Sequence, residues 1–511
     1  MSFSARFKGT ESFAVLMLLF LVGYGAAAVA TRTSQHVWGD DWAQYVNHAR
    51  NIASDRDYND TGYMFNRQRP NIGPPSYPPG TALLLAPVEH WAGLDIKALK
   101  LVSIGCLVLA LAAVFLVHAG SVGPMAALAA SLLFGLHPQV WEYIGSVLSE
   151  PPFILFSLAA LIAARWRPGL AAKMGWHLAS GVVVGLLAYA AFACRSIGIT
   201  LLAALFLYEF AGGRLRRPWI WAVLISAAAC MLLQSAMLGL ADYSEELSQR
   251  SLMRVLVNVG GYWESMAFLL PLSGRLSLVT PAMVILLAGV GTYVVACRNR
   301  ELQSHLAGWR SWVEAVPLEI WYLLCYVGAL IVLPFAPNSR YLLPVFPIIL
   351  AFAVYGGIVL ANALRWQRVV TAPAVILSVA YYIVLWRHEP AIDPQGGAFC
   401  EDCQELYSTI KSRVAADKAV AFAKPRALAL LTDRHSWIWS DKRSAAETWS
   451  EFAATGVSYL VTVNPSHELA PIYPSFLSWD GWRSRAGATL VFENASFRLI
   501  EIGQVDAVSN P

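Results

Sequence analysis

Two adjacent aspartates, Asp40 and Asp41, stand at the start of the segment GDDWAQYVNHARNI (39–52). Tyr45 and Ala49 follow at helical spacing, which predicts a helix that carries the acids at its N-terminal end. A carboxylate in this position can act as a general base that takes a proton from an attacking hydroxyl. Aspartate is also a favoured helix cap and is stabilised by the positive end of the helix dipole. The residues alone leave both interpretations open.

Three further ionisable residues stand where apolar segments begin. Glu150 precedes two prolines in VLSEPPFILF, Arg195 lies in CRSIGITLL, and Arg340 lies in NSRYLLPVFP. A guanidinium matches phosphate oxygens in a two-pronged geometry, so both arginines are candidate phosphate ligands, and Arg340 is favoured. The simpler structural explanations are an arginine that snorkels to the membrane surface and a glutamate that stabilises a helix start.

A proline-rich turn, PPSYPPGTALLLAPV (74–88), carries Tyr77 and leads into an apolar segment. Arg67 and Arg69 lie shortly before this turn and are candidates for binding an anionic head group. Solvated loop arginines are the commoner case, and a proline at a helix start explains the turn without any functional role.

The composition defines the kind of protein that must position these residues. Of 511 residues, 57% are hydrophobic and only 14% are charged, and the mean hydropathy is +0.51. Soluble proteins carry about 25% charged residues, so an ordinary soluble enzyme is excluded. A net charge of +4 gives no indication of nucleic-acid binding, and seven cysteines are too few for a disulfide framework. The composition predicts a polytopic α-helical membrane protein.

About eleven apolar runs approach the length of roughly 20 residues that crosses a membrane. They cover residues 12–30, 98–118, 123–140, 149–165, 176–193, 196–211, 219–240, 278–297, 317–335, 341–361 and 369–387. Lysine and arginine predominate in alternate short loops, which predicts that those loops are cytoplasmic. These loops contain Arg165, Arg167, Lys173, Arg214, Arg216, Arg217, Arg298, Arg300, Arg310, Arg365 and Arg368. The N-terminus is then cytoplasmic and, with an odd number of spans, the C-terminus is external.

Two polar stretches face the outside in this topology, the loop at about 31–97 and the C-terminal segment. We therefore expect a transmembrane module at 1–387, which includes that loop, and a small external α/β domain at 388–511. The elements predicted for the domain are strands in 418–425 and 457–463, a hairpin over 489–501, and helices over 403–416 and 444–454. Cys400 and Cys403 are candidates for a disulfide in an oxidising compartment.

Taken in order, these segments resemble the bacterial GT-C glycosyltransferases, in particular the protein O-mannosyltransferase-like group that includes the lipid A aminoarabinose transferases. The resemblance rests on the acid pair after the first span, the YPPG turn, the SEPPF helix start and the SRYLLPVFP turn. It covers essentially the whole chain. The expected fold is a GT-C membrane fold of about eleven transmembrane helices with a small periplasmic α/β C-terminal domain.

The resemblance implies a function that the residues alone do not specify. It implies an inverting transfer of a hexosyl or pentosyl group from a polyprenyl-phosphate donor to a hydroxyl acceptor. The reaction would take place at the periplasmic face of a bacterial inner membrane. The expected partners are the lipid-linked donor, a lipid, glycan or protein acceptor, and membrane lipids, with no nucleic acid.

The family's catalytic aspartate lies in the first external loop, with a tyrosine four positions later and a small residue eight positions later. Asp41 fits this register with Tyr45 and Ala49, and Asp40 is the second candidate for the base. The aminoarabinose transferases have a lysine that contacts the lipid phosphate where this chain has Tyr77. The resemblance therefore does not imply that aminoarabinose is the sugar.

The remaining candidates take roles under the same resemblance. Glu150 would orient the acceptor or, together with the two aspartates, hold a divalent cation, although no spacing demands a metal. Cations must stabilise the charge that develops on the leaving polyprenyl phosphate. The candidates for donor binding are Arg340 first, then Arg195, Arg67, Arg69 and Tyr77.

Three other functions compete with this interpretation. A transporter or lipid flippase would have interrupted spans in matching halves and charges near the membrane midplane. A noncatalytic envelope-assembly protein would not require the acid pair. A glycan ligase or polymerase with an undecaprenyl-diphosphate donor would carry its arginines in a large late loop, for which 241–277, with Arg250, Arg254 and Arg275, is the candidate.

Overall fold

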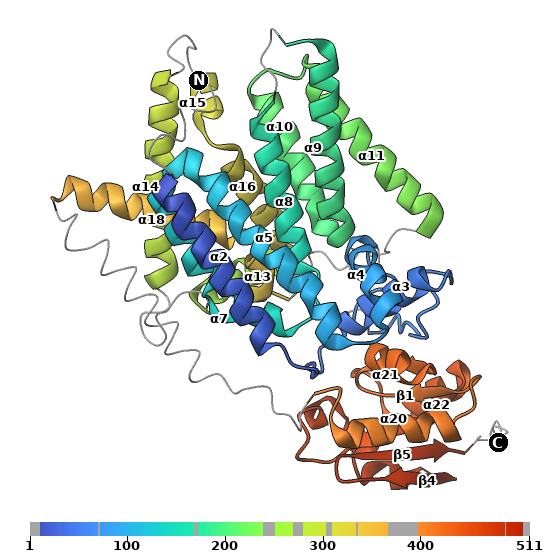
Figure 1. Ribbon diagram of the computed structural model, residues 1–511. Coiled ribbons are helices and arrows are strands. Elements are labelled where there is room, and N and C mark those ends of the chain that lie inside the picture. Colours follow the sequence, from blue (N-terminus) through green and yellow to red (C-terminus); the bar gives the residue numbers. More distant parts are fainter. Residues whose placement is uncertain are drawn as a thin grey trace. The chain divides into compact units, whose positions relative to one another are not determined.

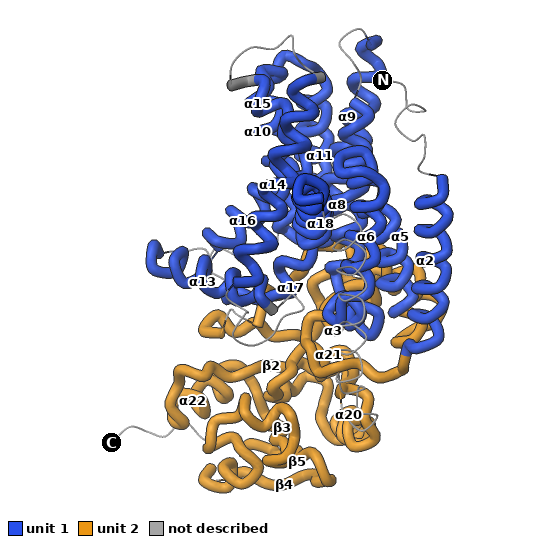
Figure 2. Tube along the Cα trace, turned by 90° about the vertical axis from the view of Figure 1, so that its left-hand side faces the viewer, with its two compact units in different colours: residues 1–32, 100–240, 246–389 blue, residues 33–99, 241–245, 390–511 orange. Residues whose placement is uncertain are grey.

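The computed structural model describes residues 11–69, 72–167, 172–238, 251–268, 279–302, 309–333, 336–365, 397–485 and 487–503. The chain forms two compact units, coloured separately in Figure 2. The first consists of residues 1–32, 100–240 and 246–389, and the second of residues 33–99, 241–245 and 390–511. The polar loop at 33–99 thus groups with the C-terminal segment. The domain boundary expected at residue 388 stays a prediction.

The first unit is built from helices, many of which run side by side (Figure 1). In chain order they are α2 (Glu11–Thr31), α5 (Ile96–Val122), α6 (Pro124–Gly135), α7 (Pro138–Glu142), η2 (Tyr143–Gly145), α8 (Glu150–Arg165), α9 (Met174–Cys194), η3 (Ser196–Gly198), α10 (Ile199–Ala211), α11 (Pro218–Leu238), α13 (Leu252–Phe268), α14 (Val279–Leu302), α15 (Trp309–Ala315), α16 (Leu318–Val332), α17 (Ser339–Leu342) and α18 (Phe346–Ala363). Each predicted apolar run from 12–30 to 341–361 overlaps one of these helices. The last predicted run, 369–387, lies outside the described residues.

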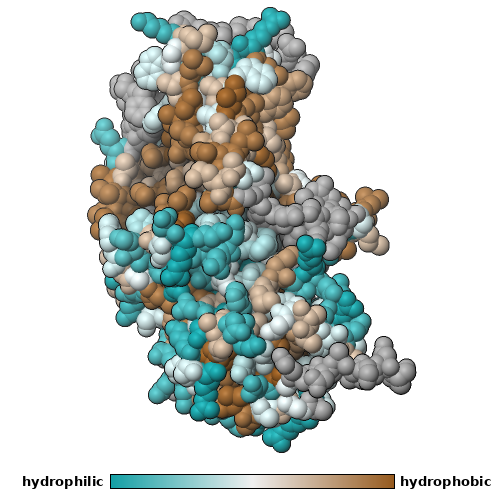
Figure 3. Space-filling model, turned by 90° about the vertical axis from the view of Figure 1, so that its right-hand side faces the viewer, coloured by the Kyte–Doolittle hydropathy of each residue, from teal (hydrophilic) through white to brown (hydrophobic). Residues whose placement is uncertain are grey.

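Six of the described helices are long and apolar enough to cross a membrane, or seven if one bent pair is counted as a span. The bent pair joins Pro138–Gly145 to Glu150–Arg165 at 114°. The predicted number of eleven is not confirmed, because several predicted runs form apolar helices shorter than 18 residues, such as α6 and α16. Apolar side chains cover much of the helical surface in Figure 3, as expected for a protein that contacts lipid.

Small residues allow close contacts between helices of this unit. A Cβ on Gly356 of α18 would lie only 1.9 Å from the backbone oxygen of Leu287 in α14. A Cβ on Gly185 of α9 would lie 2.4 Å from the backbone oxygen of Val223 in α11. Such contacts are typical of helix packing in membranes, where small residues let backbones approach each other.

Helix α8 separates two groups of charged residues within the first unit. Glu150 is its first residue and Arg165 its last, so about 22 Å of helix lies between them. Arg165 pairs with the buried Glu319 of α16. At the same end, Arg167 and Arg214 both pair with the buried Glu209, at 2.9 and 3.1 Å. Arginines of two loops predicted to be cytoplasmic therefore gather at one end of the helices.

The second unit contains a five-stranded sheet of order β2-β1-β3-β5-β4. Its strands are β1 (Ala419–Ala421), β2 (His435–Trp437), β3 (Val457–Val463), β4 (Ala488–Glu493) and β5 (Phe497–Ile502). Strand β1 pairs in parallel with β2 and β3, whereas β3–β5 and β5–β4 are antiparallel. The helices of this unit are α3 (Asp41–Ala53), α4 (Gly80–Ala92), α20 (Glu401–Arg413), α21 (Pro425–Thr432) and α22 (Ala445–Thr455). The predicted α/β organisation is present, and β2 and α21 are elements that the sequence did not predict.

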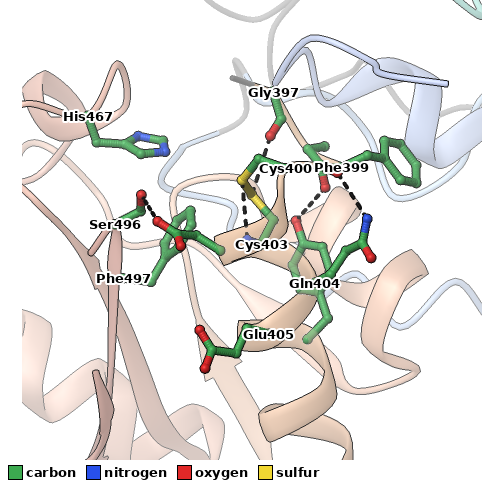
Figure 4. The surroundings of a disulfide bond; sticks show 12 residues. Gly397, Phe399, Cys400, Cys403, Gln404, Glu405, His467, Ser496 and Phe497 are labelled. Carbon is green, nitrogen blue, oxygen red and sulfur yellow. Dashed lines mark hydrogen bonds between the residues drawn. A yellow bond between two sulfur atoms is a disulfide. The ribbon is translucent and has the colours of Figure 1, made fainter. Parts of the chain in front are cut away.

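Cys400 and Cys403 form a disulfide at the start of α20, shown in Figure 4. The backbone N–H of Cys403 donates a hydrogen bond to Sγ of Cys400 at 3.2 Å. Beside it, the backbone N–H of Ala398 donates to the carbonyl oxygen of His36 at 2.9 Å. The segment that precedes the disulfide thus contacts the chain shortly before the acid pair. Both cysteines are buried.

Candidate functional site

Helix α3 begins at the acid pair, as predicted, and the two aspartates have different contacts. The side chain of Asp40 does not cap α3. Its two oxygens accept hydrogen bonds from the backbone amides of Arg426 (3.3 Å) and Ala427 (3.1 Å), in the first turn of α21. Lys424, the N-cap residue of α21, makes no side-chain cap bond. Asp40 therefore caps α21 from a distant part of the chain.

Asp41 faces side chains instead of backbone amides. Its Oδ1 accepts a hydrogen bond of 2.7 Å from the Tyr77 hydroxyl and one of 3.4 Å from Nη1 of Arg426. The Tyr77 ring stacks on Tyr45, with 5.0 Å between ring centroids. One third of the Asp41 side chain, 33%, remains exposed. Three residues that the sequence singled out therefore meet at one place, and an arginine of the C-terminal segment joins them.

The side chain of Arg426 is fully buried between two aromatic rings. Its guanidinium carbon lies 4.8 Å from the ring centroid of Tyr63 and 4.7 Å from that of Tyr77. Nη1 donates to the Tyr77 hydroxyl at 2.7 Å, and Nη2 donates to the carbonyl oxygen of Pro74 at 3.2 Å. Gly73 has φ +107°, and a Cβ there would lie 2.6 Å from Nη2, so this approach requires glycine. We refer to Asp40, Asp41, Tyr63, Tyr77 and Arg426 as the aspartate cluster.

Burial and charge act together on the ionisable groups of this cluster. Burial raises the pKa of Asp40, although the positive charges of Arg426 and Lys424 and two backbone hydrogen bonds oppose the shift. Burial also raises the pKa of Tyr63 to about 12. Burial lowers the pKa of Arg426, but neighbouring groups, with Tyr77 and Asp40 first, outweigh it and leave the pKa raised. The guanidinium therefore remains charged.

His48 of α3 fixes the turn that carries Tyr77. Its Nε2 accepts the backbone N–H of Tyr77 at 3.2 Å, so we assign the proton to Nδ1, which donates to the carbonyl oxygen of Tyr58 at 2.7 Å. The imidazole also stacks on the Tyr58 ring, with 4.1 Å between centroids. Burial lowers the pKa of His48 to about 4, which keeps the imidazole neutral near pH 7.

The two loop arginines predicted as head-group ligands differ in environment. Arg67 is exposed. Arg69 is half-buried and its Nη1 donates to the carbonyl oxygen of Trp439 at 3.1 Å. Burial lowers the pKa of Arg69. Arg69 thus contacts the C-terminal segment, and the head-group role of both arginines stays a prediction.

In the first unit, the structure brings together the three residues predicted at the starts of apolar segments. Oε1 of the fully buried Glu150 accepts hydrogen bonds from Nη1 of Arg195, at 2.5 Å, and from Nε of Arg340. Nη1 of Arg195 also donates to Ser149 at 3.1 Å. The side chains of Arg195 and Arg340 are 18% and 31% exposed. One carboxylate thus faces two guanidinium groups, and we refer to Ser149, Glu150, Arg195 and Arg340 as the arginine cluster.

Helix α17 positions Arg340 through a local cap and a neighbouring helix. The side chain of Asn338 accepts the backbone N–H of Arg340 at 2.9 Å. Gly261 of α13 lets Pro337 approach, because a Cβ on this glycine would lie 2.6 Å from Cγ of Pro337. The buried side-chain amide of Asn258 in the same helix donates to the carbonyl oxygen of Leu333 at 2.6 Å. Helix α13 thus holds both ends of the 333–337 connection.

The segment 241–277 is the candidate for a large late loop. Its residues Leu252–Phe268 form helix α13, which corrects that expectation for the described part of the segment. Arg254 is half-buried on α13. Arg250 and Arg275, the other arginines considered for a glycan ligase or polymerase, lie outside the described residues.

No metal site is evident within the described part of the chain, where no group of three or more His, Cys, Asp or Glu side chains is arranged to hold a cation. The candidate ligands have other contacts. Glu150 accepts from two arginines, and Asp40 accepts from two backbone amides.

Comparison with known proteins identifies the architecture. No family model matches the sequence, and no curated protein matches it. Two structures of ArnT from Cupriavidus metallidurans are similar over nearly the whole chain. The one bound to undecaprenyl phosphate has 13% identity and a TM-score of 0.54 and covers 98% of this chain and 99% of that one. The apo structure has 11% identity and a TM-score of 0.55 and covers 96% and 97%. This chain has the GT-C fold.

The likeness extends to an archaeal enzyme of the same fold. The oligosaccharyltransferase of Archaeoglobus fulgidus, in a complex with Zn and sulfate, has 13% identity and a TM-score of 0.54. It covers 86% of this chain, whereas this chain covers 67% of it. Another structure of that organism's oligosaccharyltransferase AglB contains an inhibitory peptide and a dolichol-phosphate, with 13% identity and a TM-score of 0.52. The GT-C fold predicted from the sequence is thus confirmed.

Proposed function

We propose that this protein is an inverting glycosyltransferase that moves a sugar from a polyprenyl-phosphate donor to a hydroxyl acceptor. Its site would lie at the outer face of a bacterial inner membrane, with the N-terminus cytoplasmic and the C-terminal segment periplasmic. The observation that carries the proposal is Asp41, a one-third exposed carboxylate that accepts a hydrogen bond from Tyr77, in a chain with the GT-C fold. The ArnT structure that contains undecaprenyl phosphate supports a lipid-phosphate donor.

The proposed chemistry is one displacement at the anomeric carbon. The acceptor O–H bond breaks as the hydroxyl oxygen bonds to that carbon, and the proton passes to Asp41. The bond from the anomeric carbon to the phosphate oxygen breaks, and its electron pair leaves with the polyprenyl phosphate. A single displacement inverts the configuration at the anomeric carbon.

Geometry favours Asp41 over Asp40 as the base. Both oxygens of Asp40 accept backbone amides, so proton transfer to Asp40 would weaken the cap of α21. The raised pKa of Asp40 is the one property that favours the opposite assignment, because a more basic carboxylate is a better proton acceptor near neutral pH. We assign the base to Asp41 because its exposed part can reach an acceptor without breaking a helix cap.

The arginine cluster suits the leaving phosphate. With Glu150 ionised, two guanidinium groups and one carboxylate carry one net positive charge. Guanidinium groups of this kind stabilise the charge that develops on a leaving phosphate oxygen. Arg340 is the more exposed of the two arginines, so we propose it as the principal ligand. Glu150 then orients both arginines instead of contacting the acceptor.

The proposed orientation of the protein in the membrane follows from the charged residues at the two ends of α8. The arginines gathered at its C-terminal end belong to the basic loops that the positive-inside rule places in the cytoplasm. Glu150 lies at the other end of the same helix, so the arginine cluster is proposed to face the periplasm.

The experiment that tests the proposal is sugar transfer from radiolabelled polyprenyl-phosphate sugars to host membrane fractions by the purified protein. We expect Asp41→Asn to lower transfer by a factor of about 10² or more, since it removes the general base. Asp40→Asn should retain most of the activity, and Asp417→Asn, which changes an exposed aspartate of the same unit, serves as the matched control. Normal transfer by Asp41→Asn would refute the assignment, and retention of the anomeric configuration would refute the single displacement.

The donor panel should separate single-sugar transfer from oligosaccharide transfer. The match to ArnT spans both chains almost completely, whereas the archaeal oligosaccharyltransferase extends well beyond this chain. We therefore propose a single hexosyl or pentosyl group as the transferred unit. Preferential transfer from a polyprenyl-diphosphate oligosaccharide would favour the ligase alternative.

A further inference from the structure

Arg426 belongs to the C-terminal segment, yet its guanidinium contacts the loop that contains the acid pair. Its Nη1 donates one hydrogen bond to the Tyr77 hydroxyl at 2.7 Å and another to Oδ1 of Asp41 at 3.4 Å. The Tyr77 hydroxyl in turn donates to Oδ1 of Asp41 at 2.7 Å. Two donors thus converge on one carboxylate oxygen, and the three groups form a closed triangle of contacts.

We propose that Arg426 and Tyr77 are positioning residues that orient Asp41, the proposed base, to take the proton of the acceptor. The inference rests on the proposed function and deepens it, because it makes the C-terminal segment part of the catalytic apparatus. Neither residue needs to contact substrate to do this. Their effect is exerted through the orientation and the ionisation of Asp41.

The burial of Arg426 excludes a role as a substrate ligand in this arrangement. Its side chain is fully buried, whereas that of Asp41 is 33% exposed. A phosphate ligand must reach its substrate, and this guanidinium is covered by the rings of Tyr63 and Tyr77. A buried guanidinium beside a carboxylate is instead suited to stabilising the charged form of that carboxylate.

The contacts of Arg426 also indicate that it is held for orientation as well as for packing. Its Nε is buried and has no hydrogen-bond partner in the structure, which is a cost that most buried polar groups avoid. Nη1, in contrast, is aimed at Tyr77 and Asp41. Nε of Arg426 thus lacks a hydrogen bond, whereas the two hydrogen bonds of Nη1, to Tyr77 and to Asp41, help to determine where Oδ1 of Asp41 lies.

Several neighbouring groups act on the charge of Asp41. Arg426 and Tyr77 favour its ionised form directly, by charge and by a donated hydrogen bond. The neighbouring Asp40 opposes ionisation as a like charge, and Lys424, whose charge acts on Asp40, moderates this effect. Removal of Arg426 or of the Tyr77 hydroxyl should therefore make Asp41 easier to protonate.

A labelling experiment tests the inference without requiring turnover. The protein is treated with a water-soluble carbodiimide and an amine over a pH series, and mass spectrometry quantifies the modified Asp41 peptide. Protonated carboxyl groups react, so the midpoint of labelling follows the protonation of Asp41. In Tyr77→Phe and Arg426→Gln we expect this midpoint to move up by roughly one pH unit. Arg443→Gln removes an arginine of the same unit that pairs with Glu447 and is the matched control.

Steady-state kinetics provide the second readout. Tyr77→Phe keeps the ring that stacks on Tyr45, so it should fold even where Arg426→Gln does not. We expect Tyr77→Phe to lower kcat by roughly 10-fold or more while KM changes by less than about twofold, because a charged hydrogen bond is lost at the base and not at the substrate. Arg426→Lys keeps the charge without the planar fork, and should restore the labelling midpoint more fully than kcat.

The outcomes separate the inference from the proposed function. Unchanged Asp41 labelling in both Tyr77→Phe and Arg426→Gln overturns the inference, whatever the enzyme does. A shifted labelling midpoint together with a normal kcat also overturns it, since the contacts of Arg426 and Tyr77 with Asp41 would then have no catalytic consequence. If the labelling midpoint shifts in the variants but the wild-type protein transfers no sugar from any donor, the positioning of Asp41 by Arg426 and Tyr77 is upheld and the transferase proposal is refuted.

Discussion

The hydroxyl of Tyr77 donates a 2.7 Å hydrogen bond to Oδ1 of Asp41, so the proline turn and the acid pair belong to one site. Resemblance to the aminoarabinose transferases predicts a phosphate-binding lysine at the position of Tyr77. Tyrosine has no charge to offer a phosphate, but its hydroxyl can donate to a carboxylate and accept from a guanidinium at the same time. Under our proposal, this position orients Asp41 instead of binding an anion.

The role of Asp40 as a cap leads to a stability prediction. Asp40→Ala removes the acceptor for the first-turn amides of α21 and should destabilise the second unit by about 1 kcal/mol. Asp40→Asn keeps a side-chain acceptor and should cost less. Denaturant unfolding followed by tryptophan fluorescence measures both changes. If Asp40→Ala left stability unchanged but abolished transfer, Asp40 would be the base and its capping role incidental.

Two adjacent glycines of α13 provide a second prediction with an internal control. Gly261→Ala should destabilise the protein and weaken donor binding, because the added methyl would lie 2.6 Å from Cγ of Pro337 and displace the connection to α17. Gly260→Ala introduces the same methyl where nothing lies within 4 Å. It should be neutral or stabilise the helix by roughly 0.5–1 kcal/mol. Thermal unfolding and undecaprenyl-phosphate binding of the two variants measure the difference, and equal behaviour would contradict the role assigned to Gly261.

The sequence predicted the elements that local pattern specifies. Long apolar runs gave the helices of the first unit, and strand β3 was predicted at 457–463, where it occurs. The acid pair was placed at a helix start, and Glu150, Arg195 and Arg340 were grouped by their positions at the starts of apolar segments. These predictions succeeded because hydrophobic periodicity and helix-end chemistry are local properties.

The elements that were missed depend on distant parts of the chain. Helix α21 is only eight residues long and receives its cap from Asp40, so its own sequence carries only Pro425 at the first position as a start signal. Helix α13 contains two glycines and several β-branched residues, which lower its helix propensity. Arg426 could not be recognised as part of the site, because a single arginine among apolar residues gives no indication of the tyrosines that cover it.

The buried His48 leads to a prediction about pH. Burial lowers its pKa to about 4 from 6.5, with a smaller effect from the charge of Arg426, while the hydrogen bond to Tyr58 opposes the shift. Below about pH 6.5 the unfolded chain binds a proton that the folded chain refuses until about pH 4. Folding stability should therefore fall as pH falls through this window, by up to roughly 1.4 kcal/mol per pH unit.

The measurement is the unfolding free energy of the wild type and His48→Gln between pH 7 and pH 4.5. The variant should show a smaller loss of stability on acidification, since it cannot take up this proton, even if it is less stable at pH 7. His90→Gln, at an exposed histidine of the same unit, is the control and should keep the wild-type pH dependence. Identical slopes for the wild type and His48→Gln would mean that this histidine does not set the acid sensitivity.

Substitutions of Arg340 and of Glu150 should have different effects on lipid-phosphate binding. Arg340→Gln removes the more exposed guanidinium of the arginine cluster and should weaken undecaprenyl-phosphate binding by roughly 10-fold or more, as expected for a lost charged hydrogen bond. Glu150→Gln removes the carboxylate that both arginines share, so it should leave binding intact or stronger. It should also lower thermal stability, because two partly buried guanidinium groups then lose the carboxylate that they share. Binding isotherms in detergent, with exposed Arg300→Gln as the control, measure these effects. Weaker binding in Glu150→Gln than in Arg340→Gln would instead assign the lipid phosphate to a different set of cations.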